Sequence, residues 1–191
     1  MTSALPADRA GLIAELERLE SDFLSLAAPL DRDRFDWRPD GGRTWSFGQI
    51  VDHLATTNSR YLDALEPALE RARERSGGRS GPIEPGLLGR LFLGQLEPPV
   101  RYRVRAPGPF RPAPRVEREE TLDRFRTQQA RIAALVRASA DLDPRRARFR
   151  NPAVKGLPVF DLAAGMLILP SHERRHLEQA RRLLARPDFP R

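Results

Sequence analysis

The chain has 191 residues, 40% of them hydrophobic, with no cysteine and a formal net charge of +7. This length suits one domain over residues 1–191 that buries a core without cross-links. The missing thiols exclude disulfides, thiolate metal ligands and a cysteine nucleophile.

The positive charge is almost entirely arginine, interleaved with acidic residues along the chain. This pattern is more typical of a compositional bias than of a basic stripe, so we expect no nucleic-acid partner. A nucleic-acid-binding protein stays an alternative suggested by charge alone, and it predicts binding that weakens steeply with salt. No apolar run reaches the length of a membrane span, and the first residues carry charge too early for a signal peptide. We therefore expect a cytoplasmic protein with no membrane partner.

Two helices are predicted in the first half of the chain. Apolar residues at helical spacing indicate a first helix over about residues 8–26, followed by a loop over residues 30–44. Ser46 and Gln49 have the spacing of a capping box, which predicts the start of a second helix. That helix ends in a glycine- and serine-rich linker near residues 76–81.

The segment from about residue 76 to residue 118 is irregular, because glycine and proline interrupt it repeatedly. Within it, residues 89–96 indicate a short helix. Residues 100–105 alternate between apolar residues and arginine, which is typical of a short extended segment. The prolines of residues 107–114 favour a polyproline-like extended backbone.

The last third of the chain predicts two more helices. The first covers about residues 122–138, and a loop with Pro144 and Pro152 follows it. The second begins near Val159 and runs to about Leu184. Pro170 lies inside it and should kink the helix or restart it. Four long helices with no convincing sheet indicate an all-α fold, a four-helix bundle.

The chain contains three histidines, and their placement is informative. His172 and His176 are four residues apart, which puts both imidazoles on one face of a helix. His53 lies beside the apolar stripe of the second predicted helix, where a neighbouring helix can bring it to the same ion. Three neutral imidazoles leave open coordination positions, as in catalytic metal centres. The sequence therefore predicts a site for a divalent ion such as zinc, nickel, iron or copper.

Residues 172–176 also match the HExxH pattern of zinc proteases, in which Glu173 would be the general base. We reject the protease interpretation because no third ligand follows His176 and no substrate-binding sheet edge is visible. Glu173 points about 100° away from His172 around a helix. It is a weak candidate base, and a surface position or a local ion pair suits it better.

Two further residues accompany the histidines. Gln179 lies on the histidine side of its helix, where it either hydrogen-bonds a group that surrounds the metal ligands or packs there and satisfies a loop carbonyl. Trp45 either lines a pocket or, as we prefer, anchors the chain just before the helix cap. Asp52, the neighbour of His53, is disfavoured as a base on the same helical geometry as Glu173.

Three stretches of the sequence resemble the DinB/YfiT-like superfamily: DWRPDGGRTWS (residues 36–46), WSFGQIVDHLATTNSRYL (residues 45–62) and SHERRHLEQARRLL (residues 171–184). The last stretch carries the superfamily pattern H-x-x-x-H-x-x-Q in His172, His176 and Gln179. The resemblance implies a four-helix bundle of DinB/YfiT type, often dimeric, with a metal ion held by His53, His172 and His176. Characterised relatives are thiol-dependent transferases and isomerases, among them bacillithiol S-transferases and a mycothiol-dependent isomerase.

From this resemblance we expect a homodimeric, divalent-metal-dependent enzyme that transfers a low-molecular-weight thiol to an electrophile. An external thiol is consistent with the cysteine-free chain. Carboxylates of the thiol or of the substrate are candidate binding partners of Arg101, Arg103 and Arg105. A run of arginines like this one is, however, more often a solvated face. The alternative is a non-catalytic, metal-stabilised bundle that acts in a stress response or carries a ligand.

Overall fold

The computed structural model describes residues 5–75, 80–96, 106–153 and 159–191. The extended segment predicted at residues 100–105 lies outside the described residues, and so do Arg101, Arg103 and Arg105.

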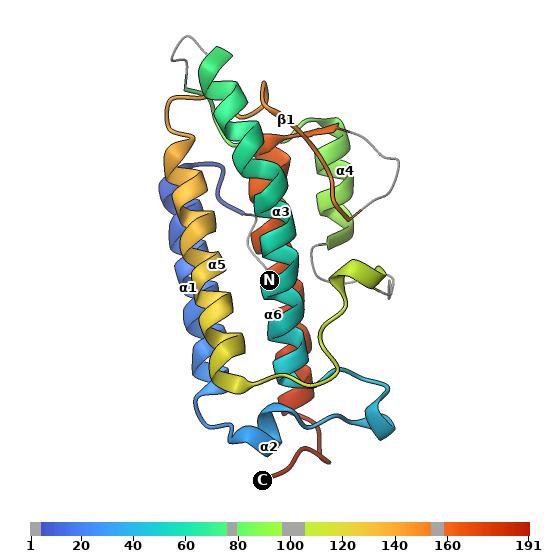
Figure 1. Ribbon diagram of the computed structural model, residues 1–191. Helices are drawn as coiled ribbons and strands as arrows, with labels where there is room; N and C mark the ends of the chain where they lie inside the picture. Colours follow the sequence, from blue (N-terminus) through green and yellow to red (C-terminus); the bar gives the residue numbers. More distant parts are fainter. Residues whose placement is uncertain (1–4, 76–79, 97–105, 154–158) are drawn as a thin grey trace.

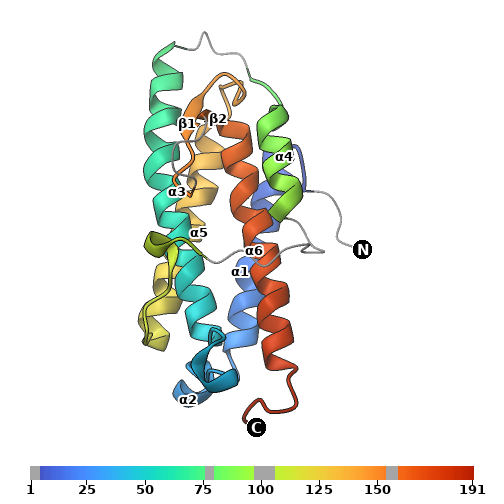
Figure 2. The same ribbon diagram turned by 90° about the vertical axis from the view of Figure 1, so that its right-hand side faces the viewer.

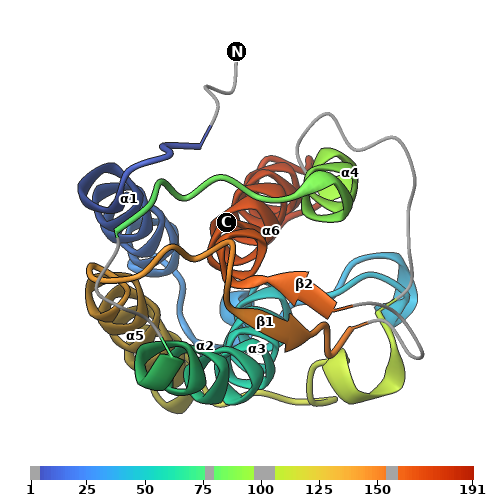
Figure 3. The ribbon, with the colours of Figure 1, turned by 90° about the horizontal axis from the view of Figure 1, so that it is seen from above.

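Four long helices form a bundle (Figure 1), namely α1 (Arg9–Ala27), α3 (Phe47–Arg75), α5 (Arg118–Ala138) and α6 (Leu162–Leu184). Seen from above, α1 and α3 lie at opposite corners, and α5 and α6 each contact both of them (Figure 3). α1 and α6 run in one direction, whereas α3 and α5 run in the other. The parallel pair α3 and α5 therefore needs a long crossover connection. The predicted all-α four-helix bundle is confirmed.

The smaller elements lie at the ends and sides of the bundle: α2 (Arg32–Phe35), α4 (Leu87–Leu96), the 3-10 turns η1 (Asp40–Gly42) and η2 (Gly108–Phe110), and strands β1 (Arg148–Arg150) and β2 (Val159–Asp161). The two strands pair antiparallel, with Phe149 opposite Phe160. Figure 2 shows this hairpin at the same end of the bundle as α4. The short helix expected at residues 89–96 is thus confirmed as α4.

The capping box predicted for the second helix is present at the start of α3. The N–H of Gln49 donates to Ser46 Oγ at 3.0 Å, and the N–H of Ser46 donates to Gln49 Oε1 at 3.3 Å. Two backbone donors that the helix itself leaves without partners are thereby satisfied. This reciprocal pair fixes where α3 begins, and with it the position of His53 two turns later.

The hairpin corrects our expectation that the described chain holds no sheet and that the last helix begins near Val159. Residues Val159–Asp161 form β2, and α6 begins at Leu162. Asp161 caps α6, because its Oδ1 accepts from the N–H of Ala164 at 2.8 Å. Strands of three residues are too short for a periodic pattern to reveal them.

Two expectations about proline also change. α6 is a single helix that passes through Pro170, so the helix does not restart there. One lost backbone hydrogen bond is tolerated within a helix that packs against α1, α3 and α4. Among residues 107–114, the 3-10 turn η2 interrupts the expected extended backbone. On either side of that turn, Pro107 (φ −55°, ψ 151°) and Arg111 (φ −72°, ψ 141°) keep angles close to polyproline II.

The core consists of two apolar clusters, one toward each end of the bundle. One includes Tyr61, Leu65 and Ile132, beneath the hairpin and α4. The other includes Phe23 and Phe125, whose ring centroids are 5.3 Å apart, at the end where α2 lies. Buried polar residues of α3, α5 and α6 separate the two clusters: Asn58, Gln129 and Glu173. A layer of buried polar residues therefore lies between the two apolar clusters.

α4 lies against α6 through a close contact at Gly89. A Cβ atom at this position would come within 2.6 Å of the Ala164 Cβ, so glycine allows the two helices to touch. The outer face of α4 exposes Leu87, Leu88 and Leu91. Even so, none of the helices in the described part of the chain is long and apolar enough to cross a membrane.

Candidate metal centre

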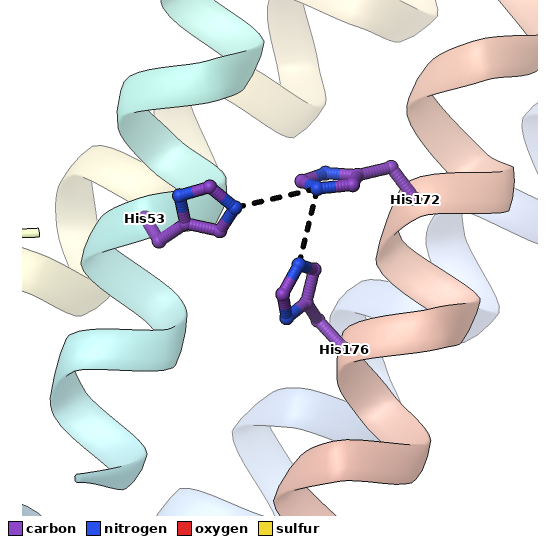
Figure 4. Close-up of side chains that lie close together, drawn as sticks. All are labelled: His53, His172 and His176. Carbon is purple, nitrogen blue, oxygen red and sulfur yellow. Dashed lines mark hydrogen bonds between the residues drawn. The ribbon is translucent and has the colours of Figure 1, made fainter. Parts of the chain in front are cut away.

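The three histidines converge at one point between α3 and α6 (Figure 4). One ring nitrogen of each lies within 4.8 Å of the others. The Nε2 of His172 is 3.0 Å from the Nε2 of His176 and 3.3 Å from the Nε2 of His53. Nitrogens that bind one tetrahedral zinc ion, with bonds of roughly 2.0–2.1 Å, are about 3.3 Å apart. The group therefore has the spacing of a metal-binding triad.

Hydrogen bonds on the far side of two rings set which nitrogen carries the proton. His53 Nδ1 lies 2.5 Å from the carbonyl oxygen of Phe110, and His176 Nδ1 lies 2.8 Å from Gln179 Oε1. Both oxygens are acceptors, so both Nδ1 atoms donate and both Nε2 atoms carry a lone pair. Gln179 thus hydrogen-bonds a histidine of the triad itself, where we expected a group around the ligands or a loop carbonyl.

The donor set fits a cation better than it fits hydrogen bonding alone. With the Nε2 atoms of His53 and His176 unprotonated, at most one proton, on His172 Nε2, can lie among the three nitrogens. The Nδ1 of His172 is buried and has no hydrogen-bond partner among the described residues. A divalent cation would accept all three lone pairs, and nitrogen ligands suit zinc, nickel and iron. His53, His172 and His176 would hold it.

Burial also keeps these imidazoles neutral. It lowers the pKa of His172 and His176 well below the ordinary value of 6.5, and neighbouring positive charge adds to the effect. The pKa of His53 is lowered for the same reason. Because metals bind the neutral form of histidine, the site is ready for a cation at neutral pH.

Trp45 lies against the histidines, where we preferred a simple anchor. Its ring centroid is 4.9 Å from that of His53, and the ring stacks on His176 at 6.3 Å. Trp45 also packs against the apolar cluster at this end of the bundle, so it does anchor the chain before α3. The indole thus forms one wall of the candidate site. In the sequence, a single tryptophan before a helix cap gave no reason to prefer this role over that of an anchor.

Glu173 occupies a different place from the one expected. It is fully buried, with 0% of its surface exposed, so the prediction of a surface position or a local ion pair is wrong. Its two oxygens accept from Asn58 Nδ2 and Gln129 Nε2, each at 2.8 Å. The 100° turn away from His172 leads into the middle of the bundle, because α6 has neighbours on several sides. Burial raises the pKa of Glu173 to about 7.

The two arginines between the histidines face other neighbours. Arg174 Nε donates to Glu15 Oε1 of α1 at 2.6 Å, in an ion pair whose side chains are both about 10% exposed. Arg175 Nη1 donates to the carbonyl oxygen of Gln95 in α4 at 3.4 Å. The positive charge of Arg175 also contributes to the lowered pKa values of all three histidines. Arg175 is therefore a cation close to the candidate metal, which sequence reasoning did not single out.

The sequence profile of the DinB superfamily matches residues 15–180 of the chain. No curated protein and no solved structure matches it. The matched range contains all three histidines and the crossover between α3 and α5.

Proposed function

Because the chain belongs to the DinB superfamily, we propose that it is a divalent-metal-dependent enzyme that transfers a low-molecular-weight thiol to an electrophile. The reaction would be that of an S-transferase or an isomerase. The observation that supports this proposal best is the convergence of the three Nε2 atoms on one buried point.

Three protein ligands leave coordination positions for an exogenous molecule, as in catalytic sites. A divalent cation in this place would supply one piece of chemistry, since it lowers the pKa of a bound thiol and so presents a thiolate nucleophile at neutral pH. The protein has no thiol of its own. The thiol nucleophile of this reaction must therefore come from another molecule.

The residues around the triad have their own parts in this proposal. Trp45 covers one side of His53 and His176 and limits the access of water there. Arg175 places positive charge near the site, which favours a thiol or an electrophile that carries a carboxylate. Neither oxygen of Glu173 is available without breaking a hydrogen bond to α3 or α5. We therefore assign Glu173 no catalytic role.

Elemental analysis of the purified protein, beside a His172→Ala variant, tests the metal site. We expect about one zinc, nickel or iron ion per chain in the wild type and none in the variant. Thiol consumption is then followed with glutathione, bacillithiol or mycothiol and an aryl halide or epoxide. Turnover should disappear on chelation and return on reloading.

Two results would count against the proposal. Absence of metal, even after reloading with zinc or nickel, would exclude the site. Bound metal without turnover of any thiol would favour the alternative, a metal-stabilised bundle that acts in a stress response or carries a ligand. The expected homodimer stays a prediction, which sedimentation velocity of the full chain checks.

A further inference from the structure

The proline-rich segment, residues 106–117, lies beside α3 and leads to the start of α5 (Figure 2). It contributes no side chain to the histidine triad, but the carbonyl oxygen of Phe110 accepts the Nδ1–H of His53. We propose that this segment is a positioning element that fixes the tautomer and ring orientation of His53 for metal binding. This inference rests on the metal site of the proposed function.

The Phe110 carbonyl is held in place on both sides. Arg60 of α3 donates from Nε to the carbonyl oxygen of Pro109 at 2.8 Å. The same guanidinium lies over the Phe110 ring, 5.6 Å from its centroid. The ring is 4% exposed and packs into the apolar cluster beneath the hairpin. Neither the main chain before Phe110 nor its side chain can shift without losing a contact to the bundle.

The following residues are tied to α3 as well, about two turns closer to its start. The N–H of Ala113 donates to Asp52 Oδ2 at 2.9 Å, and Gln49 Nε2 donates to the Ala113 carbonyl oxygen at 2.9 Å. Asp52 is held in turn by Arg124 of α5 through an ion pair of 2.7 Å. α3 therefore binds the main chain of this segment on both sides of His53.

The prolines reduce the entropic cost of ordering this segment. Pro107, Pro109, Pro112 and Pro114 each fix one φ angle and lack an N–H that would need a partner. A segment with few conformations in the unfolded chain loses little entropy when it becomes ordered. The acceptor for His53 is thus in position before a metal ion arrives, and partners of this kind tune metal affinity.

The three histidine rings of the triad have different hydrogen-bond partners, so an effect on His53 can be measured separately from the other two. His176 is held by Gln179 of its own helix, and the Nδ1 of His172 has no partner among the described residues. The brace on His53 is the one that comes from an element remote in sequence, 57 positions away. Loosening the proline-rich segment should therefore change His53 and leave the other two rings as they are.

The test compares two matched pairs of variants. Arg60→Ala removes a contact of the segment, whereas Arg73→Ala removes a similar one elsewhere, since Arg73 of α3 donates to the carbonyl oxygen of Ala138 at 2.8 Å. Phe110→Leu and Phe149→Leu each replace a buried ring of the same apolar cluster with a smaller side chain. Zinc affinity is measured by competition with a chelating dye. The tautomer of His53 is read from imidazole nitrogen shifts in the metal-free protein.

We expect Arg60→Ala and Phe110→Leu to weaken zinc binding by about 10- to 100-fold. In both, the metal-free His53 should change from a single Nδ1–H form to a mixture of tautomers. Arg73→Ala and Phe149→Leu should leave affinity and tautomer unchanged. The inference is overturned if Arg60→Ala and Phe110→Leu retain the wild-type tautomer, whatever happens to affinity. The tautomer needs no metal, so it decides this point even if the wild type binds no zinc and the proposed function fails.

Discussion

Two adjacent residues of α6 lead into two different buried polar groups. Around His172, nitrogen lone pairs face one another and at most one proton can lie among them. Around Glu173, each carboxylate oxygen receives an N–H from a side-chain amide of Asn58 or Gln129. Both groups are largely buried, so burial does not by itself mark a binding site. The histidine group differs because its nitrogen lone pairs face one another, whereas the acceptors without a partner in the second group, Asn58 Oδ1 and Gln129 Oε1, belong to the amides that donate to Glu173. A cation would accept the lone pairs of the histidine group.

Removing a ligand should have the largest effect on this contrast. In His172→Ala, two nitrogens remain and zinc affinity should fall by more than about 100-fold. The free energy of unfolding of the metal-free protein should change by less than about 1 kcal/mol, because His172 is partly exposed. Elemental analysis and urea titration measure the two quantities. A variant that keeps its metal would show that the triad is not the site.

Glu173→Ala should do the reverse. It leaves the buried amide groups of Asn58 and Gln129 without their acceptor, so the free energy of unfolding should fall by about 3 kcal/mol. Glu173→Gln keeps the shape of the side chain and should cost less. Both variants should bind zinc as the wild type does when folded. If Glu173→Gln folds but loses zinc, the two polar groups are one site and the contrast fails.

Gln179→Ala removes the hydrogen-bond partner of one proposed metal ligand and leaves the ligands themselves in place. Without the acceptor for Nδ1, the ring of His176 is free to turn, and zinc affinity should fall by about 10-fold. Because Gln179 is partly exposed, thermal unfolding of the metal-free protein should be nearly unchanged. Zinc competition by a dye and melting curves separate the two effects. Equal affinity in the variant would mean that this contact packs the helix end only.

The smallest effect concerns Glu15, which pairs with the next residue of α6, Arg174. Burial by itself would raise the pKa of Glu15, but hydrogen bonds and charges of Arg18 and Arg174 lower it to about 2 from 4.5. This stabilisation is present above pH 4.5 and is lost as the pH falls toward 2. Because the side chain of Arg18 is 48% exposed, solvent screening limits this stabilisation to about 1 kcal/mol. Urea titrations at pH 6 and pH 3 should show a smaller pH effect in Glu15→Gln than in the wild type.

Periodicity and spacing predicted much of this molecule. The apolar stripes predicted the four long helices, and the four-residue spacing of His172 and His176 predicted that they share a face. The prediction put Glu173 at the surface because it points away from His172 around the helix. Such a residue reaches solvent only where the helix has a side without neighbours. Residues 162–171 of α6 are buried without a break, so this part of the helix has no side that faces solvent.

Other parts had no pattern to reveal them. The strands β1 and β2 have three residues each, too few for an alternation. The partner of His53 Nδ1 is a main-chain carbonyl, which every residue has, so no residue type at position 110 could indicate it. Contacts of this kind depend on where the chain passes and not on which side chain it carries.

The histidine triad depends on contacts between residues that are far apart in the sequence. His53 must meet His172 across 119 positions of the chain, and its carbonyl partner arrives only after the crossover has returned to α3. Loops of such length close late, since their entropy is lost before their contacts form. Helices and local turns can therefore form well before the triad exists. In a refolding experiment, we expect zinc uptake to follow the formation of the helices.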